Sequence, residues 1–171
     1  MEIKTNYISR IDKTRVEALY RDVDDYEELD GMKIESVHAV CFCGGKMVLV
    51  YEKDKKTWSS PGGGVEDGES VEQAVVREVR EESNMKVIQQ KLIGVQINIL
   101  ENGRKIIQTR SVCLVEPYGD FVSDPAGDVT EIKLIDPAEY AKYYYWGANS
   151  DRMMERALDK AKEMQEMFIP K

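Results

Sequence analysis

The sequence predicts a mixed α/β domain in which helices pack on both sides of a mixed β-sheet. Gly44-Gly45 and Asn102-Gly103 each separate two strand-like runs, which is typical of β-hairpins. Apolar residues recur at helical spacing over residues 71–83 and again over residues 151–168. Because helical segments alternate with groups of strands, we expect both helices to pack against one sheet.

The first 33 residues are expected to form a helical extension, followed by a main domain over residues 34–171. Thr14 and Glu17 have the spacing of a capping box, which marks the start of a helix. Apolar side chains then follow at helical spacing, namely Val16, Leu19, Tyr20 and Val23. The sequence therefore predicts an amphipathic helix over residues 15–28, beside the main domain or packed on it.

The middle of the chain reads as a series of strands that run over residues 34–43, 47–51, 86–100, 105–116 and 130–135. His38 is interpreted as a strand residue. Asp136-Pro137 ends the last strand, and Pro137 is tolerated in the first turn of a short helix.

The C-terminal part of the chain combines an aromatic cluster with a long predicted helix. Tyr143, Tyr144, Tyr145 and Trp146 could close over a substrate, form a dimer contact or pack the last helix against the sheet. The helix is predicted over residues 151–168, with core positions at Met154, Ala157, Leu158, Ala161, Met164 and Phe168.

Composition narrows the class of protein. The net charge of −8 argues against a long footprint on a nucleic-acid backbone. The chain has no apolar run long enough to span a membrane, and its polar first ten residues do not resemble a signal peptide. Three cysteines, an odd number, then favour reduced thiols and a cytoplasmic protein. Cys41 and Cys43 have no further partners at zinc-site spacing, so we interpret them as core residues.

The helix predicted over residues 71–83 has an unusual inner face. Ser70 is a suitable N-cap with Gln73 as its capping-box partner, and Asn84 suits the left-handed end of a helix. Apolar residues and glutamates share one side of it, namely Val71, Ala74, Val75, Glu78, Val79 and Glu82, with Glu81 beside them. Buried like charges need compensation, and a hard divalent cation prefers carboxylate ligands. A solvated acidic face, the alternative, would place the glutamates opposite the apolar residues.

Acidic residues, an arginine and a glycine recur here at fixed spacing: Gly63, Glu69, Arg77-Glu78-Val79, Glu81-Glu82 and Asn84-Met85. The pattern resembles the Nudix box, Gly-x5-Glu-x7-Arg-Glu-U-x-Glu-Glu-x-Gly-U, where U is a bulky apolar residue. Asn84 replaces the last glycine, a mild departure because Asn also tolerates positive φ. The resemblance implies the Nudix α/β/α sandwich and a Mg²⁺-dependent hydrolase, with Mn²⁺ as a substitute, that cleaves a diphosphate linkage.

The resemblance also implies roles for individual residues. Glu78, Glu81, Glu82 and the backbone carbonyl of Gly63 would bind the metal, and Glu78 is also a candidate general base. Arg77 would orient Glu78, and Glu69 would support Arg77 or a second metal ion. In this family the base sometimes lies outside the box, which makes Glu131 a candidate and Asp128 a weaker one; for Glu131, a solvated strand residue is an equal alternative.

The substrate is expected to be a small nucleotide-like molecule, a nucleoside diphosphate linked to a second group that the sequence does not identify. Trp58 could stack on a flat part of that substrate or be a core aromatic that supports the glycine loop. Two other functions stay open. One is a catalytically silent Nudix-fold sensor of nucleotide ligands, and the other is an RNA-end hydrolase, which the net charge disfavours. The family resemblance also favours a homodimer.

Overall fold

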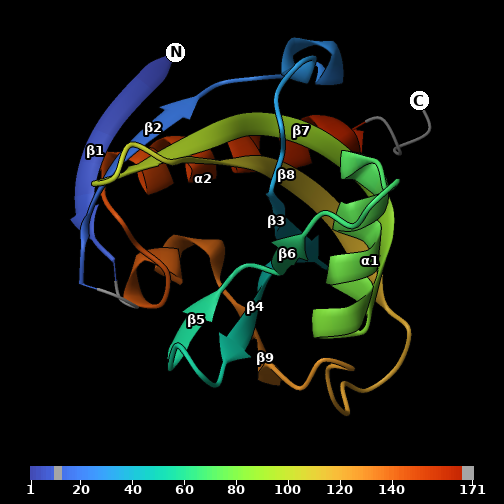
Figure 1. Cartoon of the computed structure of the whole chain (residues 1–171). Coiled ribbons are helices and arrows are strands. Elements are labelled where there is room, and N and C mark those ends of the chain that lie inside the picture. The colour runs from blue at the N-terminus through green and yellow to red at the C-terminus, as the bar shows by residue number, and fades with distance from the viewer. Residues whose placement is uncertain (10–12, 167–171) are drawn as a thin grey trace.

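The computed structural model describes residues 1–9 and 13–166, and in this part of the chain one nine-stranded sheet carries two α-helices (Figure 1). The main strand order is β1-β2-β7-β8-β3-β4-β5, while β6 pairs with β3 and β9 pairs with β4. The strands are β1 (Glu2–Ile8), β2 (Arg15–Arg21), β3 (Ser36–Cys43), β4 (Lys46–Glu52), β5 (Thr57–Ser59), β6 (Gly62–Gly64), β7 (Met85–Leu100), β8 (Lys105–Pro117) and β9 (Val129–Ile135).

The two helices, α1 (Val71–Ser83) and α2 (Ala148–Glu166), cover different faces of the sheet. Alternate residues of β3 show this, because successive side chains of a strand point to opposite faces. Val37, Ala39 and Cys41 pack in the cluster that contains the buried residues of α1. Val40 and Phe42 pack instead in the cluster that contains the buried methionines of α2. The predicted three-layer α/β/α arrangement around a mixed sheet is therefore confirmed.

Both predicted hairpins are present. Gly44 and Gly45 connect β3 to β4 with φ angles of 54° and 78°, a left-handed conformation that suits a two-residue turn. β7 and β8 form the longest pairing of the sheet, and the turn between them contains Gly103 at φ 80°. β9 also follows the prediction within one residue, and a 3-10 helix, η2 (Pro137–Lys142), begins at the predicted proline.

The prediction of a helix over residues 15–28 is wrong. Residues 15–21 form strand β2, which pairs with β1 on one side and with β7 on the other. A 3-10 helix, η1 (Tyr26–Leu29), is the helical element between β2 and β3. Val16, Ala18 and Tyr20 are buried in alternation, so the apolar residues follow the period of two of a strand. The boundary between an extension and a main domain near residue 34 stays a prediction.

The C-terminal helix agrees with the prediction over most of its length. It begins at Ala148 rather than Asp151 and is described as far as Glu166, so the predicted core residue Phe168 lies outside the described residues. Ala157 and Ala161 are buried as expected, together with Met154 and Met164. Leu158 is 44% exposed, so its assignment to the core was wrong. No helix in the described ranges has both the length and the apolar character needed to cross a membrane.

Candidate active site

Helix α1 has the local structure that its sequence predicts. The Ser70 hydroxyl accepts a hydrogen bond from the Gln73 amide at 3.2 Å, and the Ser70 amide donates to the Gln73 side chain at 2.9 Å. Asn84 ends the helix in the left-handed conformation with φ 53°. Glu78 is buried to 8% exposure on the inner face, between Ala74 and the end of the helix. The predicted placement of a glutamate among buried apolar residues is confirmed.

The glycine loop lies directly against this face of α1. Its three glycines form β6, in which Gly63 pairs with Val37 of β3. A Cβ atom on Gly63 would lie 2.5 Å from Oε1 of Glu78, which is closer than any side chain permits. The Gly62 amide donates a hydrogen bond to Oε2 of Glu82 at 2.8 Å. A side chain at position 63 would therefore displace the Glu78 carboxylate, and the loop holds Glu82 by a hydrogen bond.

Arg77 links the acidic side chains to one another and to the loop. Its guanidinium donates two hydrogen bonds of 2.9 Å to the carboxylate of Glu69, in a bidentate pair. It also donates to Glu78 at 2.6 Å, to Glu81 at 3.3 Å and to the backbone carbonyl of Gly64 at 2.8 Å. The hydrogen bonds between Arg77 and Glu69 lower the pKa of Glu69 and raise the pKa of Arg77. Arg77 thus contacts Glu69, Glu78 and Glu81 at once; its predicted role in orienting Glu78 stays a prediction.

We expect Arg77→Gln to lower the free energy of unfolding by about 1–3 kcal/mol, because three carboxylates lose their charged donor. Urea denaturation in chelator measures this change. Arg80→Gln, on the exposed side of the same helix, is the matched control. It removes a cation–π contact with Tyr118 and is expected to cost less than about 1 kcal/mol. Equal losses in the two variants would contradict a stabilising network centred on Arg77.

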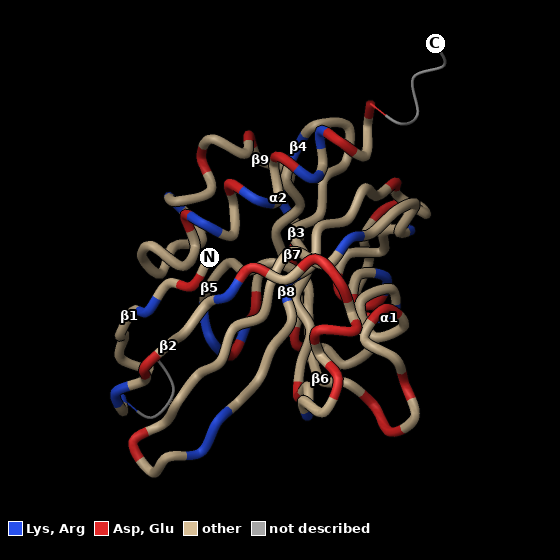
Figure 2. Tube along the Cα trace, turned by 90° about the horizontal axis from the view of Figure 1, so that it is seen from above, with Lys and Arg blue, Asp and Glu red and all other residues tan. Residues whose placement is uncertain are grey.

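The glutamates and the loop line an acidic cavity of about 480 Å³. Figure 2 shows Asp and Glu along the segment that connects β6 to α1 and on α1 itself. The acidic lining residues are Glu52, Asp54, Glu66, Glu78, Glu81, Glu82, Asp124 and Asp128, and the basic ones are Lys55 and Arg77. Eight acids against two bases give this cavity a formal charge of −6, so it would repel a phosphate unless cations intervened.

Burial sets the protonation of two of these glutamates. It raises the pKa of Glu78, and the nearby Arg77 opposes this shift. It also raises the pKa of Glu82 to about 8, against the hydrogen bond from Gly62 and with further contributions from Glu78, Glu52 and Asp124. The two carboxylates are therefore costly to ionise without a compensating positive charge.

The chemistry of this donor set fits a hard divalent cation, which prefers about six or more oxygen ligands. Among the described residues, however, no three acidic, histidine or cysteine side chains are arranged as a finished metal site. The contacts explain this: Arg77 holds Glu78 and Glu81, while the Gly62 amide holds Glu82.

The structure brings together Gly63, Arg77, Glu78, Glu81 and Glu82 around the cavity, and Glu69 reaches it through Arg77. Glu131 is exposed on β9, opposite Tyr51, and does not line the cavity. Its role as a base stays a prediction. The weaker candidate, Asp128, does line the cavity.

Glu52 and Asp124 also line the cavity, and sequence reasoning missed both. Asp124 is buried and accepts hydrogen bonds from the backbone amides of Ala126, Asp128 and Val129, so it shapes the loop that carries Asp128. Its position four residues before Asp128, in a turn with Pro125 and Gly127, is the signal that could have identified it.

Trp58 packs against other side chains and also lines a cavity, so both roles that the sequence left open stay predictions. Its ring packs against Tyr51 at 5.2 Å between centroids, and the ammonium group of Lys133 lies 4.6 Å from its centroid. The ring also packs against Tyr143 at 6.3 Å and lines a second cavity beside the acidic one.

The model of the NUDIX domain matches residues 32–157, and the chain belongs to this family. Among curated proteins, an uncharacterized Nudix hydrolase of Bacillus subtilis (strain 168), YvcI, is 39% identical over 62 residues, or 36% of this chain and 39% of that protein. A putative 8-oxo-dGTP diphosphatase of the same organism is 44% identical over 50 residues, or 29% and 34% of the two chains. The matches thus span less than half the length of either relative.

Solved structures share the fold. A mutant of the Bacillus subtilis pyrophosphohydrolase BsRppH superposes with a TM-score of 0.66 at 21% identity, covering 94% of this chain and 97% of that chain. The NUDIX domain of Shewanella oneidensis NrtR, complexed with ADP ribose, gives a TM-score of 0.60 at 20% identity over 80% and 93% of the two chains. These similarities extend the Nudix architecture beyond the box itself.

Proposed function

We propose that this protein is a divalent-metal-dependent hydrolase of a diphosphate linkage in a small nucleotide-like substrate, such as a nucleoside diphosphate linked to a second group. The observation that carries the proposal is the meeting of Glu78, Glu81 and Glu82 with the glycine loop in one acidic cavity. Mg²⁺ is the proposed ion, with Mn²⁺ as a substitute, since both accept carboxylate and carbonyl oxygens.

In this proposal the three glutamates and the backbone carbonyl of Gly63 hold the cation. When bound, it would supply charge that neutralises the phosphate oxygens and lowers the pKa of a coordinated water. Arg77 keeps Glu78 in place through its 2.6 Å hydrogen bond, and Glu69 keeps Arg77 in place.

A carboxylate must also accept the proton of the attacking water. Glu78 is the first candidate, because it is buried in the cavity wall and held by Arg77; in that case Glu81 and Glu82 would hold the cation instead of it. Asp128, on the loop across the cavity, is the second candidate, and Glu131 requires movement of β9 or its neighbours to reach the cavity. Comparison of pH–rate profiles for the Gln and Asn variants of these residues assigns the base.

A substrate panel tests the proposed function. We expect hydrolysis of at least one compound among nucleoside triphosphates, ADP-ribose, dinucleoside polyphosphates and NADH, with products split at the diphosphate. Activity is expected with Mg²⁺ or Mn²⁺ and should vanish in excess chelator. Tight binding of a panel member without turnover in either metal would contradict the hydrolase and favour a ligand sensor.

Three finer properties belong to the same proposal. A cytoplasmic location agrees with the free state of Cys41, Cys43 and Cys113. A homodimer is proposed by family resemblance, and light scattering tests it. Nucleic acid is not expected as a partner of a chain of net charge −8, and salt-dependent RNA binding in a gel shift would contradict that expectation.

A further inference from the structure

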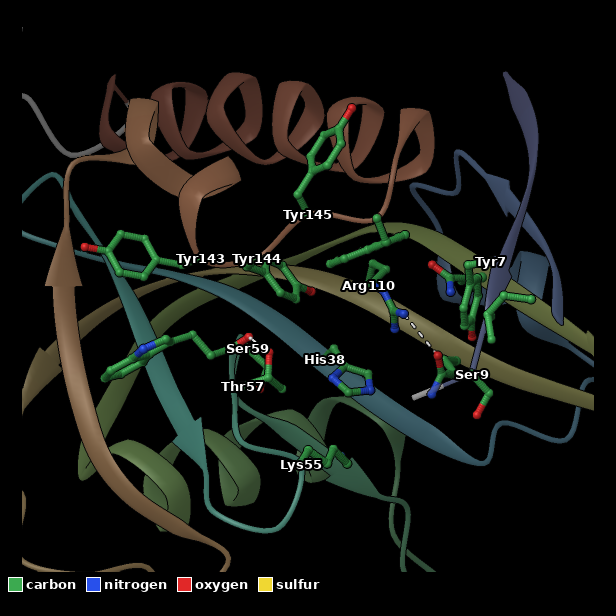
Figure 3. Close-up of a pocket in the computed structure, with 15 residues that line it drawn as sticks. Tyr7, Ser9, His38, Lys55, Thr57, Ser59, Arg110, Tyr143, Tyr144 and Tyr145 are labelled. Carbon is green, nitrogen blue, oxygen red and sulfur yellow. Dashed lines mark hydrogen bonds between the residues drawn. The ribbon is translucent and has the colours of Figure 1, made fainter. Parts of the chain in front are cut away.

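A second cavity, of about 470 Å³, lies on the face of the sheet that α2 covers (Figure 3). Its walls come from β1, β3, β5, β7, β8 and residues 143–146. Figure 3 shows Arg110, His38 and Tyr144 directed into it from different elements. Both tryptophans of the chain, Trp58 and Trp146, line it, as do three consecutive tyrosines.

Arg110 is the unusual residue of this cavity. It is 5% exposed, and its charged group has neutral hydrogen-bond partners, the Thr109 carbonyl at 3.1 Å and the Gln108 side chain at 3.0 Å. Its Nε has no hydrogen-bond partner among the described residues. A guanidinium carries five N–H donors in a fixed fork, so the donor side of Arg110 is largely unused.

The described part of the cavity wall provides no anion for the charge of Arg110. Among the described residues that line the cavity, none is an Asp or Glu. Lys55, also in the lining, forms an ion pair with Glu52, which lies outside it. Burial lowers the pKa of Arg110 and also lowers that of His38. A buried cation without an anion is costly. The chain as a whole carries a net charge of −8, so a buried guanidinium without an anionic partner among the described lining residues calls for an explanation.

Two further polar atoms of the lining are also unsatisfied. The indole Nε1 of Trp146 and the Oε1 of Gln96 are buried and have no hydrogen-bond partner in the described structure. Tyr144 packs edge to face against Trp146, with ring centroids 4.2 Å apart and an interplanar angle of 73°, so aromatic rings stand beside these atoms. Aromatic walls with a few convergent polar groups are typical of a small-molecule site.

The two cavities are neighbours. Lys55 lines both of them. Across the sheet, His38 pairs with Gly62 on one side and with Arg110 on the other. Two strand spacings therefore separate the backbone of Arg110 from the loop that holds Glu82, or roughly 10 Å. Lys55, which both cavities share, marks the place where a nucleotide with its diphosphate in the acidic cavity would extend toward Arg110.

We propose that the second cavity receives the non-reacting end of the substrate, a nucleoside-like group that carries a second anionic substituent, which pairs with Arg110. The inference rests on the proposed function for the placement of the diphosphate. The substituent is a carboxylate on the ring or a phosphate on the sugar, because both match the fork of an arginine.

Binding of matched nucleotide pairs tests the inference and distinguishes the two sources of charge. Orotidine 5′-monophosphate differs from uridine 5′-monophosphate by a ring carboxylate, and adenosine 2′,5′-bisphosphate differs from adenosine 5′-monophosphate by a sugar phosphate. The intrinsic fluorescence of Trp58 and Trp146 reports occupancy of the cavity directly. In the presence of Mg²⁺, we expect one anionic member to bind roughly tenfold to a hundredfold more tightly than its partner.

Arg110→Met should remove this preference, so that both members of the pair bind equally. Because Met removes an uncompensated buried charge, the melting temperature of the variant is expected to stay level or to rise. Lys55→Gln, at the rim, removes the ion pair with Glu52 and should weaken the preference only partly. Exposed Lys53→Gln is its matched control and should leave the preference unchanged. Lys53 lines neither cavity.

The inference is wrong if neither anionic compound binds more tightly than its partner, or if the preference survives Arg110→Met. Arg110 could instead donate hydrogen bonds to the edge of an uncharged purine. Guanosine 5′-monophosphate and adenosine 5′-monophosphate should then bind with different affinities, so equal binding of the two, with the preference for the anionic compounds intact, excludes this alternative. The monophosphates are not hydrolysed at a diphosphate, so the result does not depend on turnover. If no compound of the substrate panel is hydrolysed but the anionic nucleotide still binds more tightly than its partner, the proposed hydrolase is wrong and the inference about the second cavity stands.

Discussion

Glu82→Gln is expected to reduce hydrolysis by at least about 100-fold while the protein stays folded. In the proposed site, Glu82 supplies a carboxylate oxygen to the cation, and an amide is a far weaker ligand for Mg²⁺. The hydrogen bond from Gly62 can still be made to the amide oxygen, so the loop keeps its contact. Turnover of the best panel substrate and calorimetric binding of Mg²⁺ to the free protein measure the two effects.

Glu72→Gln is the matched control, since Glu72 lies on the same helix but outside the acidic cavity. Its activity is expected to stay within a factor of about three of the unmodified protein, because surface substitutions away from a site are usually small in effect. Parent-like turnover by Glu82→Gln would remove Glu82 from the metal-binding set.

Glu82→Gln is also expected to change how the free energy of unfolding of the metal-free protein depends on pH. The pKa of Glu82 is raised to about 8 in the folded state, while the unfolded value is near about 4.3. Between these values the folded state binds more protons, so this residue lowers the free energy of unfolding as pH rises from about 5 to about 8. Urea denaturation in chelator across that range should show this decline, and Glu82→Gln should lack that component.

Gly63→Ala is expected to reduce hydrolysis by about 100-fold, the second largest effect, through displacement of Glu78. The new Cβ would lie 2.5 Å from Oε1 and 2.6 Å from Cδ of Glu78, so the carboxylate must move. A shift of about 1 Å in a reacting group can cost this much activity. Kinetics with saturating Mn²⁺ measure the loss.

Gly64→Ala provides the matched control one residue away. A Cβ on Gly64 would have the Glu35 carbonyl oxygen, at 3.9 Å, as its nearest neighbour, which is an ordinary contact. Most activity should remain, and neither position has the positive φ that excludes a side chain. Equal losses in both variants would mean that the loop needs glycine for its backbone rather than for the space beside Glu78.

Much of the acidic cavity could be predicted from sequence because it comes from one short stretch of chain. The helical period alone placed Glu78 and Glu82 beside Ala74 and Val75, and the structure agrees. The hairpins were predictable for the same reason, since turn residues act over a few positions. Asp124 was not predictable from periodicity, because its role comes from a loop that folds back onto the cavity.

The N-terminal segment shows why local patterns fail elsewhere. Val16, Tyr20 and Val23 fit a helical stripe, but Val16, Ala18 and Tyr20 fit a strand equally well. Pairing with β7 decides between the two, because residues 16–21 form backbone hydrogen bonds with an edge of β7 that would otherwise be unpaired. Arg110 was missed for a related reason. An arginine in a run of strand residues carries no local signal of burial, and its cavity forms where distant segments meet.

The two cavities differ in how the chain assembles them. The acidic one depends largely on a compact block, from the glycine loop to the end of α1, while the cationic one draws single side chains from many separate segments. If both proposals hold, single substitutions around Arg110 would change which substrate is bound without any rearrangement of the segment from the glycine loop to the end of α1.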